Sequence, residues 1–202
     1  MSAVMPLDLF LALIVFAAVM SLTPGPNNIM LTASGVNFGF ARTIPHMSGV
    51  TVGFIVLVAA CAAGLGALFV AMPSLQLALK VAGAAYMLWL AWKVASARPA
   101  GEGTAAPVRP LTFFQAAAFQ WVNPKGVLAA FSGIALYMRP DHATTDLAIM
   151  LTVFGLCTLL AVVVWTGFGV ALRRLLGNPR HARIFNVAMG LLLVASIVPM
   201  VT

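Results

Sequence analysis

Acidic side chains are scarce in this chain of 202 residues, which has four Asp and Glu residues against eleven Lys and Arg residues. Charged residues of both signs make up only 7% of the sequence, whereas soluble domains carry about a quarter. Hydrophobic residues reach 62%, and the mean hydropathy is +1.06. The lack of charge excludes a soluble catalytic domain and indicates a protein that lies in a lipid bilayer.

Reactive and metal-binding patterns are missing as well. The two cysteines, Cys61 and Cys157, stand alone in apolar stretches, without a CxxC pair or metal-ligand spacing. The sequence also has no phosphate-binding loop, no Gly-x-Ser-x-Gly and no His-Glu-x-x-His. We therefore expect no enzyme activity, no catalytic residue, no metal and no cofactor. Without a nucleotide-binding loop, a self-contained ATP-driven pump is excluded too.

The basic residues form no long run and no patch interleaved with aromatic residues, which argues against a nucleic-acid partner. Membrane proteins instead keep Lys and Arg in their cytoplasmic loops. Alternate loops and their flanks hold Arg42, Lys93, Arg98, Arg109, Arg173, Arg174, Arg180 and Arg183, whereas the intervening loops hold only Lys80 and Arg139. This bias predicts a multi-pass protein of the bacterial inner membrane with both termini on the periplasmic side.

Six apolar segments are long enough for a helix to cross the bilayer, which takes roughly 20 residues. We expect an all-α membrane protein with helices at about 7–35 (interrupted at 23–28), 43–72, 74–97, 111–137 (broken near Pro124), 146–172 and 184–201. Residues 98–110, rich in Gly, Pro and Ala, are the linker-like segment of the chain. The Gly49-x-x-x-Gly53 spacing predicts close contact with a neighbouring helix.

The two halves of the chain resemble each other. Pro24 interrupts the first helix as Pro124 interrupts the fourth, 100 residues later. We therefore expect one integral membrane domain with a first repeat at 1–97, a cytoplasmic linker at 98–110 and a second repeat at 111–202. Because each repeat holds three helices, the second enters the membrane from the opposite side. Inverted repeats with broken helices are typical of secondary transporters.

The first break reads Thr23-Pro24-Gly25-Pro26-Asn27-Asn28. Its prolines remove two amide donors, and such a break persists in a membrane only when it is buried in protein or lines a wet cavity. Pro26 suits the first position of a restarting helix, whose free amides can bind a carboxylate. The two prolines, the glycine and the two asparagines together favour a binding cavity over a purely structural kink.

The second break, Asn123-Pro124-Lys125, carries a charge near the middle of a predicted helix, which costs roughly 2.5–3.5 kcal/mol on insertion scales. Lys125 therefore needs carbonyls of a broken helix, Asn or Gln side chains such as Gln120, or an anionic substrate group, unless a shifted helix boundary leaves it at the interface. It is also a candidate for proton coupling. His46, near the cytoplasmic face, is either a proton relay or ordinary interfacial surface.

At these residues the chain resembles the LysE/RhtB family of bacterial amino-acid exporters. The matching features are Thr23–Asn28, the segment from Gly83 to Lys93 (GAAYMLWLAWK) and Phe114–Gly126 with its Asn-Pro-Lys. Ile44–Gly49 followed by Gly53-Phe54 resembles the branch that includes a cysteine and O-acetylserine exporter. The resemblance implies outward transport of amino acids or related small metabolites across the inner membrane, in exchange for protons.

The resulting hypothesis is a zwitterionic amino acid bound between the two broken helices. The expected substrate-binding residues are Thr23, Pro24, Gly25, Pro26, Asn27, Asn28, Gln120, Asn123, Pro124 and Lys125, with Lys125 and His46 as candidates for proton coupling. Two alternatives remain: a membrane thiol–disulfide carrier using Cys61 and Cys157, and a non-transporting membrane scaffold. The sequence does not name the amino acid, and a homo-oligomer is compatible with it.

Overall fold

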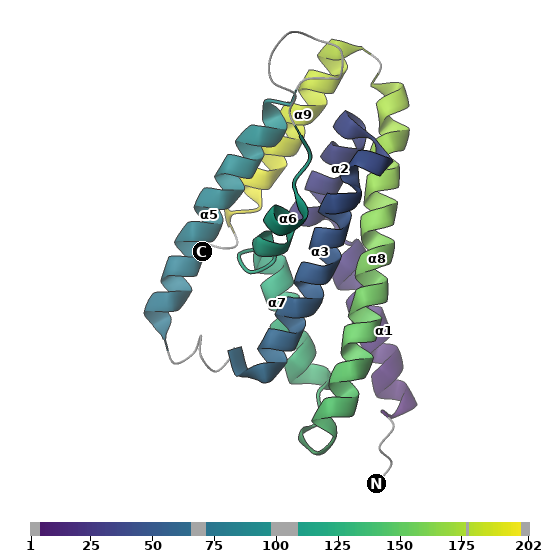
Figure 1. Ribbon diagram of the computed structural model, residues 1–202, viewed down its shortest axis with the longest axis vertical. Helices are drawn as coiled ribbons and strands as arrows, with labels where there is room; N and C mark the ends of the chain where they lie inside the picture. The colour runs from purple at the N-terminus through teal and green to yellow at the C-terminus, as the bar shows by residue number, and fades with distance from the viewer. Residues whose placement is uncertain (1–4, 66–71, 98–108, 177, 199–202) are drawn as a thin grey trace.

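The structure is a computed structural model that describes residues 5–65, 72–97, 109–176 and 178–198 (Figure 1). Within these residues it is all-helical, without strands. The helices are α1 (Leu7–Leu22), α2 (Pro26–Phe38), α3 (Phe40–Ala60) with a π-helical turn (Cys61–Leu65), α5 (Pro73–Ala95), α6 (Phe113–Phe119), α7 (Pro124–Tyr137), a short 3-10 helix (Pro140–His142), α8 (Ala143–Leu175) and α9 (Pro179–Ala195).

Each of the six predicted apolar segments contains a helix or a broken pair of helices. The first and fourth segments are interrupted at the two proline motifs. The sixth was expected to begin at residue 184 but begins at Pro179, because proline suits the first turn and Asn178 caps it by accepting from the Arg180 amide at 2.9 Å. The predicted linker lies mostly outside the described residues.

Three helices are long and apolar enough to cross a membrane, namely Phe40–Gly64, Leu77–Ala95 and Pro140–Leu175. The pair α1 and α2, bent by 52° at the first break, passes the same test when taken together. The described part of the chain is therefore an all-α protein with three or four candidate spans. The finer expectation of six crossings in two inverted repeats stays a prediction.

Close helix contacts depend on glycines. Gly49 and Gly53 of α3 face α6, and a Cβ added at Gly53 would lie 2.6 Å from the Cα atom of Ala117. In the same way, a Cβ added at Gly35 of α2 would meet the Thr166 carbonyl of α8, and one added at Gly169 of α8 would meet the Thr32 carbonyl of α2. The predicted role of the Gly49-x-x-x-Gly53 spacing is thus confirmed, because small residues let helix backbones approach closely.

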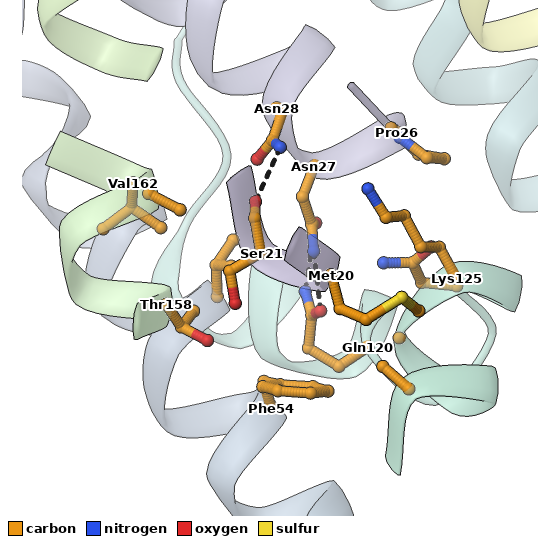
Figure 2. Close-up of a pocket in the computed structure, with 16 residues that line it drawn as sticks. Met20, Ser21, Pro26, Asn27, Asn28, Phe54, Gln120, Lys125, Thr158 and Val162 are labelled. Atoms are coloured by element: carbon orange, nitrogen blue, oxygen red, sulfur yellow. Dashed lines mark hydrogen bonds between the residues drawn. The ribbon is translucent and has the colours of Figure 1, made fainter. Parts of the chain in front are cut away.

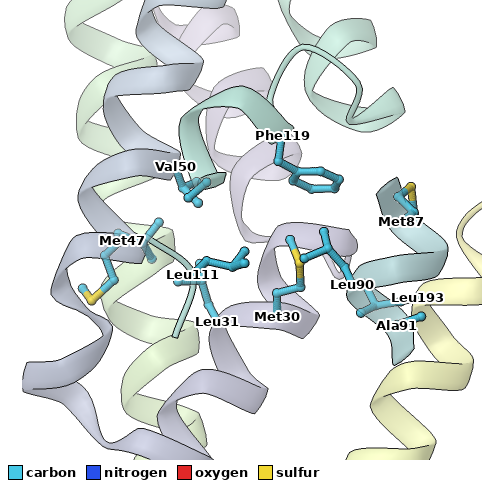
Figure 3. Packing of buried hydrophobic residues seen from close by; sticks show 12 residues of the cluster. Met30, Leu31, Met47, Val50, Met87, Leu90, Ala91, Leu111, Phe119 and Leu193 are labelled. Carbon is cyan, nitrogen blue, oxygen red and sulfur yellow. The ribbon is translucent and has the colours of Figure 1, made fainter. Parts of the chain in front are cut away.

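The polar breaks lie between two apolar clusters. The first cluster, around Met30, Leu31 and Phe119, joins α2, α3, α5, α6, α8 and α9 (Figure 3). The second, around Leu13, Phe154 and Ala130, joins α1, α3, α7 and α8. From the layer between them, α2 runs toward one end of the molecule and α7 toward the other (Figure 1). Both α2 and α7 therefore begin at mid-height.

An ion pair fixes the connection between α7 and α8. Asp146, fully buried in the first turn of α8, accepts hydrogen bonds from the backbone amide and the guanidinium of Arg139 at 2.8–3.0 Å. It is the only ion pair found among the described residues. The helix expected to begin at residue 146 begins three residues earlier, at Ala143, with Asp146 in its first turn.

Candidate functional site

The first break separates α1, which ends at Leu22, from α2, which begins at Pro26. Gly25 precedes α2 in an extended conformation and gives no side-chain cap. Proline lacks an amide donor, so the amides of Asn27 and Asn28 are the first that α2 offers. An uncapped helix N-terminus of this kind carries a partial positive charge and favours anions.

Side chains from three other helices satisfy the carbonyls at the end of α1. Asn28 of α2 donates to the carbonyls of Ser21 at 2.9 Å and Thr23 at 2.8 Å. Trp165 of α8 donates its indole N–H to the Leu22 carbonyl at 3.1 Å. Each such carbonyl, left unpaired in hydrocarbon, would cost several kcal/mol. The break therefore persists because distant residues complete its hydrogen bonds.

Lys125, in the first turn of α7, is the third donor to the first break. Its Nζ donates to the Thr23 carbonyl at 2.6 Å, to the Thr23 hydroxyl at 2.7 Å and to the Pro24 carbonyl at 3.2 Å. The ammonium thus lies at the negative end of the α1 dipole. A Cβ at Gly25 would lie 2.8 Å from the Lys125 Cδ, so this glycine makes room for the lysine. Among the partners predicted for Lys125, the structure therefore shows carbonyls of a broken helix.

The second break is completed by its own backbone. Between α6 and α7, the amides of Gln120, Trp121 and Val122 donate to the carbonyls three residues earlier at 3.1–3.2 Å. Asn123 precedes α7 without capping it. Its side-chain Oδ1 is buried and has no hydrogen-bond partner among the described residues. The α7 N-terminus and this oxygen therefore remain free to bind a ligand.

A pair of amide side chains joins the two breaks. Asn27 donates to the Gln120 Oε1 at 2.8 Å, and Gln120 donates back to the Asn27 Oδ1 at 3.2 Å. Gln120 is fully buried and also donates to the Ala116 carbonyl at 2.9 Å. The N-terminus of α2 is thus held directly against α6.

These groups surround a cavity of about 50 Å³ at the centre of the molecule (Figure 2). Its lining comprises Met20, Ser21, Gly25, Pro26, Asn27, Asn28, Val50, Phe54, Gln120, Asn123, Lys125, Gly126, Ala129, Thr158, Ala161 and Val162. At about 15 Å³ for each water, it holds roughly three. Even a small amino acid has more non-hydrogen atoms than that, so binding one requires the two breaks to separate.

Seven of the predicted site residues line this cavity: Gly25, Pro26, Asn27, Asn28, Gln120, Asn123 and Lys125. Three others lie beside it. Thr23 and Pro24 are exposed and supply oxygens to Lys125, the Thr23 carbonyl also accepts from Asn28, and Pro124 begins α7. His46 is neither here nor on the surface, because it is buried in a second cavity. The interpretation of His46 as ordinary interfacial surface is therefore wrong.

Phe54 and Thr158 are lining residues that sequence reasoning missed. They come from α3 and α8, and both point toward the cavity (Figure 2). Phe54 directly follows Gly53, a glycine that packs α3 against α6, and this position in the sequence could have indicated that Phe54 faces the interior. Thr158 stands in an apolar run whose sequence gives no sign of a binding role.

The chain matches the LysE type translocator family over residues 18–197. This chain belongs to that family. The matched region of this LysE-family protein includes both breaks and every lining residue of the central cavity. The sequence-based resemblance, the class of membrane transporter and the expectation that the protein is not an enzyme are confirmed.

The relatives of this LysE-family chain include cysteine/O-acetylserine efflux proteins. Those of Escherichia coli strain K12 and Shigella flexneri are 31% identical over 185 residues, covering 89% of this chain and 90% of the relative. That of Salmonella typhimurium strain LT2 is 32% identical with the same coverage. No solved structure matches the chain. The predicted branch of the LysE family is thus confirmed.

Proposed function

We propose that this chain exports small neutral amino acids of the cysteine and O-acetylserine type across the bacterial inner membrane. The observation that carries the proposal is the meeting of α2 and α7 at one cavity. Each begins with proline, each lacks a side-chain cap, and Lys125 lies beside both. Two helix N-termini and one ammonium make this cavity suited to a carboxylate.

The remaining groups of the cavity suit the rest of a zwitterion. The unpartnered Oδ1 of Asn123 can accept a hydrogen bond from the substrate ammonium. Met20, Phe54 and Val162 form an apolar wall to which Thr158 adds a hydroxyl. No acidic residue lines the described cavity, so a substrate with a cationic side chain would find no counter-charge. The names of the relatives, cysteine/O-acetylserine efflux proteins, agree with a small neutral substrate.

Two inverted repeats and six crossings are part of the proposal. The packing of α1 on α8 has its counterpart in that of α6 on α3, since α1 and α6 each precede a break, and α5 packs against α9 through Gly190. These pairs fit an exchange of the first three predicted segments with the last three. Rocking of the two halves would then expose the central cavity to each side alternately.

The distribution of cations supports a cytoplasmic location for one end of the molecule. Lys93 lies in the last turn of α5, and Arg173 and Arg174 lie in the last turn of α8. The ends of both helices lie beside the junction of α2 and α3 (Figure 1). We assign this end, called the α2–α3 end below, to the cytoplasm, which leaves both termini periplasmic.

Proton coupling is assigned to Lys125. Its ammonium is held by the α1 carbonyls when the substrate site is closed. For one proton to move inward as one substrate moves outward, Lys125 would give up its proton on the cytoplasmic side as the carboxylate binds at the two helix N-termini. On the periplasmic side Lys125 would take up a proton as the substrate leaves, and the ammonium would return to the α1 carbonyls.

The test is export from proteoliposomes against a panel of amino acids, with and without an imposed pH gradient. We expect gradient-dependent transport of cysteine and O-acetylserine, and none of lysine or arginine. Lys125→Met should reduce transport to background while the protein still inserts and stays folded. The matched control is Lys80→Met, which removes an exposed cation of α5 and should transport normally. Full activity of Lys125→Met would refute the assigned role.

A further inference from the structure

A second cavity, of about 40 Å³, lies toward the α2–α3 end. It is enclosed by α2, α3, α5 and the chain that leads into α6. The lining residues are Met30, Ala33, Ser34, Asn37, Phe38, His46, Leu90, Lys93, Val94, Ala97, Arg109, Pro110 and Leu111. None of the groups assigned to the central cavity belongs to it.

Ser34 and Asn37 of this second cavity are hydrogen-bonded to Thr43 and Asn186, whereas its ionisable groups have no acidic partner among the described residues. His46 is 1% exposed, and neither of its ring nitrogens has a hydrogen-bond partner among the described residues. Lys93 is half-buried and Arg109 is exposed, and no acidic residue lines the described cavity. Two cations without a counter-charge attract an anion, and a neutral histidine can donate one hydrogen bond and accept another.

The two cavities share one face of α2. Pro26 and Asn27 line the central cavity, and Met30, Ser34 and Asn37 line the second. The spacing of three or four residues places these side chains in one row along the helix. Asn27 and Ser34 are about 10 Å apart along the axis at 1.5 Å per residue. The row therefore leads from the α2–α3 end to the central site.

Apolar side chains of the first cluster close this route in the present conformation. Met30, Leu90 and Leu111 line the second cavity and also belong to that cluster (Figure 3). Methionine is unbranched and adapts its shape readily. Met30 and Leu111 are therefore the side chains whose movement would open the route toward the central cavity.

We propose that the second cavity is a loading site that holds the carboxylate of a substrate amino acid before it moves along α2. Lys93 and Arg109 bind the carboxylate, and His46 takes a hydrogen bond from the ammonium or gives one to the carboxylate. This inference rests on the proposed export of amino acids. It adds a second binding site, at the side from which the substrate enters.

Transport kinetics test the loading site. With L-cysteine supplied on the side of the α2–α3 end, Lys93→Gln should raise the half-saturating concentration about three- to tenfold, the range expected for losing one partly exposed charge contact. The maximal rate should stay within about twofold of the parent protein, because the central cavity is intact. Lys80→Gln, an exposed cation on the same helix, should change neither quantity. Equal half-saturation for the two variants would overturn the proposal.

A fluorescence measurement tests binding at the loading site independently of transport. The Lys93 Nζ lies 5.1 Å from the centroid of the Trp89 ring, so a carboxylate bound to Lys93 should change the Trp89 emission. The measurement uses the purified Lys125→Met protein, whose central site is disabled. L-cysteine should give a saturable change that L-cysteine methyl ester does not give and that Trp89→Phe and Lys93→Gln both remove.

The two possible failures can then be distinguished. If the parent protein exports nothing but the Trp89 change occurs with this specificity, the export function fails and the carboxylate site stands. If export occurs but the change is absent, or is equally large with the methyl ester, the loading site is refuted and the export function stands.

Discussion

The two helix breaks share a proline motif but complete their hydrogen bonds in different ways. At the first break, Asn28, Lys125 and Trp165 supply side-chain donors to the carbonyls at the end of α1. At the second, the backbone amides of residues 120–122 close a tight turn without outside help. The hydrogen bonds of the first break thus depend on side chains from other helices, whereas those of the second break form within its own backbone.

This difference indicates which of the two breaks moves during transport. A carbonyl held by a lysine can be released when that lysine finds another partner, whereas a carbonyl held within a turn is released only if the turn unfolds. Because Lys125 belongs to the second break and binds the first, it connects the two. We expect the α1 end of the first break to shift during transport and the turn before α7 to stay intact.

The largest effect should come from filling the space beside the lysine. Gly25→Ala places a methyl group 2.8 Å from the Lys125 Cδ, so the ammonium loses its place at the α1 carbonyls. Export in proteoliposomes should fall by at least about tenfold, as expected for misplacing a binding group by about 1 Å. Gly167→Ala is the matched control, since no atom lies within 4 Å of the added carbon. Equal export by the two variants would contradict the comparison.

A smaller effect is expected from removing a single outside donor. Trp165→Phe leaves the Leu22 carbonyl without its indole partner, which should lower the free energy of unfolding by about 1–3 kcal/mol. Thermal unfolding of the purified protein in detergent measures this. Trp92→Phe, at a tryptophan that is 68% exposed, should change the midpoint much less. If both variants unfold at the same temperature, the first break does not depend on α8.

The smallest effect should be the energetic coupling across the amide pair. A double-mutant cycle of Asn27→Ala and Gln120→Ala isolates the interaction between the two breaks. We expect a coupling free energy of about 1 kcal/mol in thermal unfolding. A value near zero would mean that the breaks are held together by Lys125 alone.

Much of the scaffold could be predicted because proline, glycine and apolar runs act locally. The interruptions before Pro26 and before Pro124 follow from missing amide donors, and the closeness of α3 and α6 follows from Gly49 and Gly53. The sequence also predicted that Lys125 needs polar partners, because a charged group near the middle of the membrane must be hydrogen-bonded or paired.

The parts that could not be predicted depend on which distant segments meet. Gln120 finds Asn27 across 93 positions, and Trp165 reaches Leu22 across 143. His46 looked like an interfacial residue because it begins an apolar segment, yet α3 turns it inward, where it lines the second cavity together with Lys93 and Leu90. No periodicity within one helix reports these contacts, because they arise only when the helices pack.

The length of α8 ties the transport site to the thickness of the membrane. Its 33 residues span about 50 Å at 1.5 Å per residue, whereas the hydrocarbon core measures about 30 Å. Such a helix tilts more in a thin bilayer than in a thick one. Trp165 of α8 is hydrogen-bonded to the end of α1, and Gly169 of α8 packs closely against α2. A change in the tilt of α8 would therefore displace both sides of the first break. The lipid composition around the protein would thereby set how readily its central cavity opens.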